Sequence, residues 1–400
     1  MSSVIAGIRR SFRSSAIVAG CWLAVATAAR GQDLQLPPLG ATLPATAAQQ
    51  RPVSYGITLA SLWDSNVVFL GAEGPSDWIS TLRLDGRLLS RTARRTASAD
   101  GYLSGALYRD LSERDRIDAG ARVDLEARPS TQTNFGLIAA ADLNHTDTLP
   151  VLSTQVVLLP LARTHSYGAT ALAQTRLSNG GFDATASFQG LSFDDPALVG
   201  DRSFGASAAW YRTLGSHARF RLEYQNRTTR YDDGRRGGSN AAVGSFTRQL
   251  TKHVSAFAAA GPQRSSDSTS TTAQWGLALR AGLALRTKRL SMTLDYNHGV
   301  SDTPGVGSDR SSDQFGAALN GTLGRRTVCA LSASESHDRL NSAASSTATV
   351  SRELKANLTQ GFGRQLYVAP FVGYRRRDRA ADRVSAFRAG VLLGYGQLQP

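Results

Sequence analysis

The sequence predicts an all-β protein, a transmembrane antiparallel up-and-down β-barrel of about 16–18 strands. Apolar and polar residues alternate along short segments over most of the chain, and short turns alternate with longer polar connectors. The composition agrees with an all-β barrel, because the 400 residues include 38 Gly and only 2 Met. No stretch resembles the Leu-, Glu- and Lys-rich amphipathic helices of a cytosolic enzyme.

Residues 1–31 have the three parts of a secretory signal peptide. Arg9 and Arg10 belong to a basic start, an apolar stretch covers 16–28, and small residues follow it. We expect cleavage near Gly31, with Ala28 as the alternative. The chain would then reach the bacterial outer membrane through the cell's export route.

The two cysteines bear on export and on covalent structure. Residues up to Cys21 also resemble a lipidation signal, but the apolar stretch before Cys21 is short and continues after it. Cleavage near Gly31 would lower the formal net charge from +14 to +10 and leave Cys329 as the only cysteine. An intrachain disulfide would then be excluded.

Residues 32–52 are rich in Pro, Ala, Thr and Gln without a hydrophobic period, which predicts a flexible periplasmic N-terminal segment. Residues 53–400 are predicted to form the outer-membrane β-barrel domain. Residues 151–160 could add a strand or lie inside the barrel. Strand parity does not close between 128 and 165, so we expect one strand boundary there to be wrong. Candidate strands lie near 54–63, 78–90, 99–110, 116–127, 134–145, 165–177, 181–192, 202–213, 218–230, 240–250, 254–263, 273–286, 289–299, 312–323, 327–337, 347–359, 365–376 and 384–396.

Two segments show the period of two most clearly. In 116–127, Ile117, Val123 and Leu125 alternate with charged residues, and 274–286 alternates leucines with Gly, Ala and Arg. Such a strand has one apolar and one polar face. No apolar run outside the signal peptide approaches the roughly 18 residues of a membrane helix.

Connector lengths favour a membrane barrel, which has short periplasmic turns and longer external loops. The expected short turns are 111–114, 178–181, 215–217, 251–253, 287–288 and 361–364. The expected longer connectors are 194–201, 231–239, 265–272, 301–312, 341–347 and 378–383.

A soluble β-sandwich or β-solenoid is the alternative architecture. A sandwich would need bulky residues throughout the packed face, whereas many face positions here are Ala or Gly. A solenoid would need a motif repeated at a fixed period, and none is present.

If the apolar faces meet lipid, the charged faces meet the lumen. One interpretation is a basic, hydrated pore with weak selectivity for anions. The other is that arginines and carboxylates pair across strands and fill the interior. The predicted lumen-lining residues are Arg116, Asp118, Arg122, Asp124, Glu126, Arg219, Arg221, Glu223, Arg280, Arg286 and Asp295.

The expected partners are outer-membrane lipid and lipopolysaccharide, the barrel-assembly machinery and an exported polysaccharide. The positive charge does not indicate nucleic acid, because its basic clusters are isolated and no DNA- or RNA-binding motif accompanies them. The sequence does not determine the oligomeric state.

We expect no enzyme, no catalytic residue, no cofactor and no metal site. The six histidines form no metal-binding motif, and no Gly-x-Ser-x-Gly or phosphate-binding glycine loop is present. Some outer-membrane barrels are enzymes that act on lipid or envelope peptide, so two histidines remain candidates. They are His298 beside Asp295, and His337 beside Asp338 and Ser336.

The start of the predicted barrel resembles the proteobacterial family of outer-membrane proteins called beta-barrel porin 2. The resemblance lies in residues 55–67, which contain Trp63-Asp64-Ser65-Asn66-Val67, in the strand from Asp77-Trp78-Ile79, and in the connection 108–114. The family implies an outer-membrane barrel with a porin-like or export role, and some members accompany exopolysaccharide genes. It brings no catalytic residue.

The expected function is therefore porin-like passage or export of hydrophilic solutes, with exopolysaccharide export as one form. The alternatives are a barrel enzyme and a closed structural or adhesive barrel. Unlike many outer-membrane barrels, the chain does not end on an aromatic residue, because 396–400 reads Gly-Gln-Leu-Gln-Pro.

Overall fold

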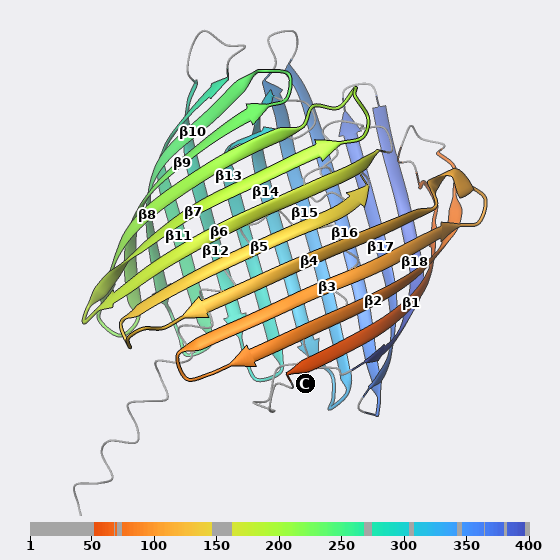
Figure 1. Ribbon diagram of the computed structural model, residues 1–400, viewed down its shortest axis with the longest axis horizontal. Coiled ribbons are helices and arrows are strands. Elements are labelled where there is room, and N and C mark those ends of the chain that lie inside the picture. The colour runs from red at the N-terminus through yellow and green to blue at the C-terminus, as the bar shows by residue number, and fades with distance from the viewer. Residues whose placement is uncertain are drawn as a thin grey trace, which may run out of the picture.

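The structure is a computed structural model that describes residues 52–67, 69, 74–145, 162–267, 274–303, 308–341, 346–363, 365–379 and 382–396. They form one antiparallel sheet of 18 strands, in which β18 pairs with β1 and closes a barrel (Figure 1). The predicted all-β barrel is confirmed. The strands are β1 (Val53–Asp64), β2 (Asp77–Arg91), β3 (Arg95–Tyr108), β4 (Arg116–Ala127), β5 (Thr133–His145), β6 (Arg163–Leu177), β7 (Gly180–Phe193), β8 (Asp201–Leu214), β9 (Ala218–Tyr231), β10 (Arg236–Gln249), β11 (Val254–Asp267), β12 (Gln274–Arg286), β13 (Leu290–Thr303), β14 (Ser308–Thr322), β15 (Thr327–Asn341), β16 (Ser346–Phe362), β17 (Leu366–Arg379) and β18 (Asp382–Gly396).

A short 3-10 helix, η1 (Ser112–Arg114), lies between β3 and β4. Within the described part of the chain, no helix is long and apolar enough to cross a membrane.

The closure gives the barrel two distinct ends. Gly56 pairs with Gly396 and Asp64 with Arg388, so β1 begins where β18 finishes. We call the end of the barrel where β1 begins and β18 finishes the near end, and the opposite end the far end. The near-end connectors are 92–94, 128–132, 178–179, 215–217, 250–253, 287–289, 323–326 and 363–365. The far-end connectors are 65–76, 109–115, 146–162, 194–200, 232–235, 268–273, 304–307, 342–345 and 380–381.

Each strand turns one face outward and one inward. Ile117, Leu222 and Trp275 are 64%, 51% and 72% exposed, although they are large apolar residues. They alternate with the charged and polar residues of their strands, which face the interior. The outer surface is therefore a band of apolar side chains, as lipid contact requires.

Glycines on the inner wall make room for aromatic rings. The Tyr102 ring of β3 lies across Gly120 of β4, where a methyl group would overlap the ring and the Asp142 carboxylate beyond it. The Tyr102 hydroxyl donates to Asp142 (3.2 Å) or Asn144 (3.0 Å) on β5. One side chain thus joins three neighbouring strands, which accounts for part of the glycine content.

The eighteen candidate strands each overlap one observed strand. The expectation of a wrong strand boundary between 128 and 165 was itself wrong, because β4, β5 and β6 match the candidate strands to within two residues and pair in antiparallel order. Residues 1–51 and 151–160 lie outside the described residues, and with them lie the predicted signal peptide and most of the predicted N-terminal segment.

Several predicted connectors were also wrong. Much of 231–239 and 301–312 is strand, and 378–379 and 382–383 of the predicted connector 378–383 also belong to strands. Polar residues beyond the apolar band continue the hairpin, because backbone pairing does not require an apolar side chain. The predicted short turn 111–114 lies at the far end, away from the other predicted short turns.

Candidate functional site

The inner wall of the barrel is the candidate site. All the predicted lumen-lining residues lie at inward positions of β4, β9, β12 and β13, because they alternate with the outward apolar residues of the same strands. The structure places them in three groups at different positions around the wall rather than in one cluster.

The β4 group forms ion pairs along its own strand. Arg116 Nε lies 3.3 Å from Asp118, and Arg122 Nε lies 2.9 Å from Asp124. Asp118 also receives His145 Nδ1 at 2.9 Å. Residues two apart share a face of a strand, so each arginine reaches the next inward carboxylate. Glu126 pairs with Arg128 just after β4, at 2.7 Å.

The β9 group is paired as well. Arg221 contacts Glu223 on its own strand (3.0 Å) and forms an ion pair with Asp183 of β7. Arg219 lies over the Tyr211 ring of β8, with its guanidinium carbon 4.6 Å from the ring centre. These contacts hold the side chains against the wall.

The third group consists of the predicted lumen-lining residues of β12 and β13. Arg280 donates from Nε to Asn297 Oδ1 (3.1 Å), and no ion pair of Arg280 is found in the part of the chain that the structure describes. Asp295 pairs in register with Gly282 and Gly316 on the neighbouring strands, and its carboxylate lies over Gly316, where an added methyl group would overlap it. Arg286 lies at the near end of β12.

Further inward pairs were missed by the sequence reasoning. They are Arg83–Asp85 (2.9 Å), Arg87–Asp100 (3.2 Å) and Lys355–Glu353 (3.0 Å). The sequence contained the pattern that identifies such a pair, since Arg83 and Asp85 are two residues apart on a strand, as Arg122 and Asp124 are. The inner wall is therefore highly charged, and many of its charges are paired, mostly along one strand rather than across strands as the second interpretation expected.

The β1–β2 connector packs against the inner wall at the far end. Phe69 is 3% exposed and contacts Val384 and Ala386, which face inward on β18. The guanidinium carbon of Arg375 lies 4.3 Å from the Phe69 ring centre, and that of Arg377 lies 5.4 Å from it.

Asp64 anchors the same connector. Its carboxylate is fully buried, pairs with Arg388 and Arg375, and accepts the Asn66 backbone N–H (3.0 Å). Ser65 adds two hydrogen bonds to β18 just beyond the end of β1. Its N–H donates to Phe387 O (2.9 Å), and its hydroxyl accepts the Phe387 N–H (2.8 Å). The Asp-Ser-Asn segment therefore has a structural role at the barrel closure.

Asp77 has a similar role at the next far-end connector. Its carboxylate is 2% exposed and accepts the backbone N–H groups of Asp110 (3.1 Å) and Leu111 (3.0 Å). Asp115 accepts the Tyr108 N–H at 2.7 Å. The motif around Asp77 thus holds the connection between β3 and β4.

The two candidate catalytic histidines are not joined to the predicted partners. His298 contacts Asp313 (2.8 Å) on the outer surface, whereas Asp295 faces inward from the same strand. His337 contacts Glu335 (2.7 Å), while Ser336 donates to Asp338 on the inner side. Adjacent strand positions point to opposite faces, so the predicted groupings cannot form. No cluster of metal-ligating side chains was found among the described residues.

Comparison with solved structures identifies the fold. OccK2 (OpdF) of Pseudomonas aeruginosa aligns over 86% of this chain and 98% of its own, with 14% identity and a TM-score of 0.51. OccK9 (OpdG) of the same organism aligns over 86% of this chain and 98% of its own, with 11% identity and a TM-score of 0.49. The siderophore receptor PirA, also from P. aeruginosa, aligns over 87% of this chain and 81% of its own, with 8% identity and a TM-score of 0.46.

No sequence family and no curated protein sequence matches the chain. The fold matches that of outer-membrane porin structures, on the OccK2 alignment.

Proposed function

We propose that this protein is an outer-membrane barrel that passes hydrophilic solutes through its lumen. The observation that carries the proposal is the division between the two faces of one closed sheet. Leucines and aromatic residues cover the outside, and charged residues occupy the inside. An apolar exterior suits lipid, whereas charged inward rows suit a hydrated interior.

The pairing of the inward charges indicates broad rather than specific selection. Arg122–Asp124 and Arg221–Glu223 largely cancel each other's field. Arg280 adds positive charge that an amide, not a carboxylate, contacts. We therefore propose weak selectivity for small anions and no dedicated anion site.

Export of exopolysaccharide is one form of this proposal, and it rests on the resemblance to the beta-barrel porin 2 family. No contact in the described residues favours a polysaccharide over other hydrophilic solutes. We also propose that the protein is not an enzyme, since neither candidate histidine meets its expected partners.

Cell fractionation and electrophoresis test the location. We expect the mature protein in the outer-membrane fraction, with a mobility that changes on boiling, because a closed sheet resists detergent. Recovery of most of the protein from the soluble periplasm would contradict the proposal.

A further inference from the structure

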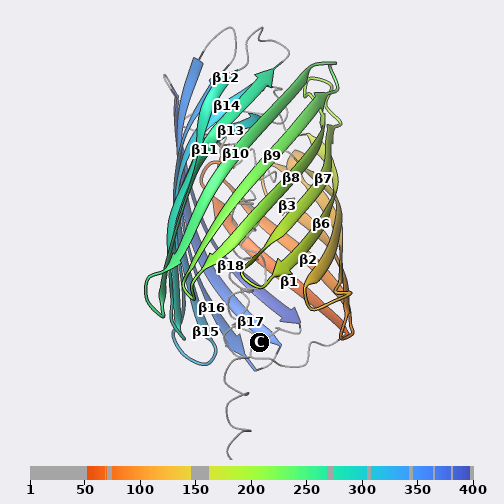
Figure 2. The same ribbon diagram turned by 90° about the vertical axis from the view of Figure 1, so that its left-hand side faces the viewer.

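One tyrosine on the inner wall of β2–β5 holds a cation and an anion apart; Figure 2 shows β2 and β3 behind the nearer green strands. Tyr102 of β3 lies across Gly120 of β4, and its hydroxyl reaches the Asp142 carboxylate of β5 at 3.2 Å. The guanidinium carbon of Arg83, on β2, lies 4.1 Å from the centre of the same ring. We call Arg83, Tyr102 and Asp142 the tyrosine site.

The Arg83 guanidinium is held in one orientation with donors left over. Its Nε donates to the two oxygens of Asp85 at 2.9 and 3.2 Å, and the Tyr102 ring supports it by a cation–π contact. Among the described residues, the two terminal NH₂ groups of Arg83 have no hydrogen-bond partner. Its side chain is 26% exposed. Arg83 therefore presents a fixed pair of donors that matches a carboxylate.

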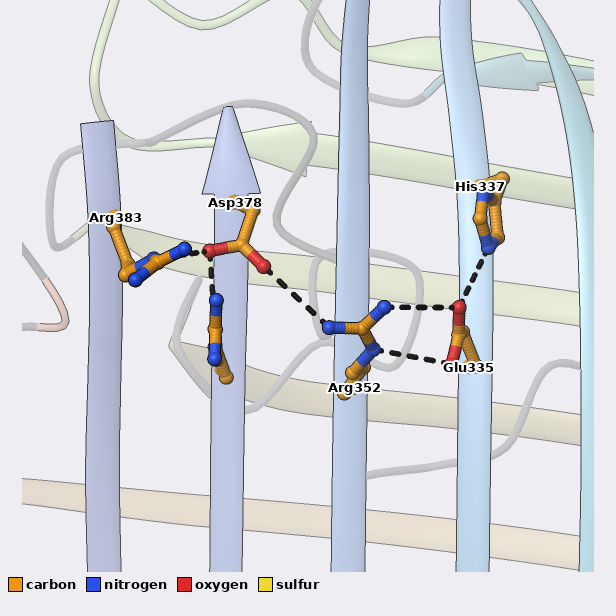
Figure 3. A network of polar contacts seen from close by, with 6 residues as sticks. Glu335, His337, Arg352, Asp378 and Arg383 are labelled. Carbon is orange, nitrogen blue, oxygen red and sulfur yellow. Dashed lines mark hydrogen bonds and ion pairs between the residues drawn. The ribbon is translucent and has the colours of Figure 1, made fainter. Parts of the chain in front are cut away.

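Other arginines of this chain use their terminal donors on its own carboxylates. On the inner wall, Arg122 donates from both Nε (2.9 Å) and Nη2 (3.0 Å) to the next carboxylate along its strand. On the outer surface, Arg352 bridges Glu335 (3.1 Å) and Asp378 (3.7 Å), as Figure 3 shows. Arg83 differs from both, because its one carboxylate contact is made through Nε alone.

Asp142 is a half-buried carboxylate without a cation of its own. Its Oδ1 is close to the Tyr102 hydroxyl, which Asn144 Oδ1 also approaches at 3.0 Å. Arg83 and Arg122 lie near enough to act on its charge, but neither forms an ion pair with it in the part of the chain that the structure describes. Its Oδ2 can therefore accept a hydrogen bond from an ammonium group.

The neighbouring charges favour a solute that carries both signs. An anion at Arg83 is repelled by the carboxylates of Asp85 and Asp142, and a cation at Asp142 is repelled by Arg83 and Arg122. A zwitterion places an opposite charge against each group, so both repulsions are offset within one molecule.

We propose that the tyrosine site binds the zwitterions of small α-amino acids in the lumen. The carboxylate of the amino acid accepts from the terminal NH₂ groups of Arg83, and its ammonium group donates to Asp142. Tyr102 sets the spacing, because it contacts both charged groups. Two charge-assisted hydrogen bonds of about 2.8 Å each, joined by an amino acid, span that spacing. The proposal rests on the passage of solutes under Proposed function and names one class of solute.

The test measures how tightly the purified full-length protein binds L-alanine in detergent, by NMR titration of the isotope-labelled amino acid. Propionate and ethylammonium are the matched probes, because each keeps one of the two charges of alanine. We expect L-alanine to bind about tenfold tighter than either probe. R83Q and D142N should each lower the affinity for L-alanine by a similar factor. A boiling-dependent mobility shift shows that the variants fold.

The two variants should differ in their response to the matched probes. R83Q should not weaken the binding of ethylammonium, and D142N should not weaken the binding of propionate, because each variant loses one charged contact. R352Q is the control, since it removes an arginine from the outer surface. It should leave the affinity for all three probes unchanged.

Similar affinities of the parent protein for all three probes would overturn the proposal. Unchanged binding of L-alanine by either R83Q or D142N, or an equal loss in R352Q, would overturn it too. Conductance of the same preparations separates this result from the passage of solutes. A protein that conducts without preferring L-alanine contradicts the tyrosine site alone, whereas one that binds L-alanine without conducting contradicts passage and keeps the site.

Discussion

The buried carboxylate of Asp64 forms an ion pair with Arg388, its register partner across the junction between the first and last strands. Arg375 of β17 reaches the same carboxylate oxygen at 3.4 Å and donates to Asn66 O at 3.1 Å. The pair therefore links closure of the barrel to the placement of the β1–β2 connector.

Replacing Asp64 with Asn should destabilise the barrel. It leaves Arg375 and Arg388 without their shared carboxylate in a buried setting, at a cost of about 3 kcal/mol. Chemical unfolding in detergent, followed by tryptophan fluorescence, measures the change in the free energy of unfolding. The control is D233N, which removes an exposed pair at the same end and should have little effect. Equal stability of D64N and the parent would contradict this role.

Neighbouring residues on β12 should respond in opposite ways. Leu279→Arg puts a charge on the lipid face near mid-membrane and should cost roughly 2–4 kcal/mol of folding free energy. Arg280→Leu should be tolerated far better, because Arg280 faces inward and its Nε donates to an amide oxygen, Asn297 Oδ1, rather than to a carboxylate. Folding yield into detergent or lipid, scored by the boiling-dependent shift, measures both. Equal damage would show that these faces are assigned wrongly.

Gly120→Ala should also destabilise the barrel. The added methyl group overlaps the Tyr102 ring and the Asp142 carboxylate, so the bridge from β3 to β5 must move. We expect a loss of about 1–3 kcal/mol in the free energy of unfolding, typical of overpacking. Gly86→Ala is the matched control, since nothing lies within 4 Å of its added methyl group. A similar change in the free energy of unfolding for both substitutions would contradict the claim that Tyr102 and Asp142 pack closely against Gly120.

Alternation was sufficient to predict the strands and their faces. The pattern in 116–127 separates Ile117 from Asp118 because the side-chain period of a strand is two, whatever its partner strand. This property predicted every strand position at least in part. It also placed Arg221 and Leu222 on opposite faces without knowledge of the fold.

Contacts between strands could not be predicted, because they depend on register. His298 meets Asp313, and Arg87 meets Asp100, only once β13–β14 and β2–β3 are aligned. Register depends on turn geometry, and most connectors lack the Asn-Gly or Asp-Gly signals of tight hairpins, with Asn179-Gly180 and Asp233-Gly234 as exceptions. The extent of β10 beyond the apolar band was missed for a related reason, since polar hairpins resemble loops in sequence.

Ion selectivity in planar bilayers tests the central claim, passage of solutes through a charged lumen, most directly. The purified protein should give stepwise conductance, and its reversal potential in a salt gradient should lean toward chloride. R219S/R221S should move that potential toward cations, because it removes two positive charges and frees Glu223 and Asp183 from Arg221. A barrel that inserts but never conducts, or one whose selectivity ignores the double substitution, would contradict the account.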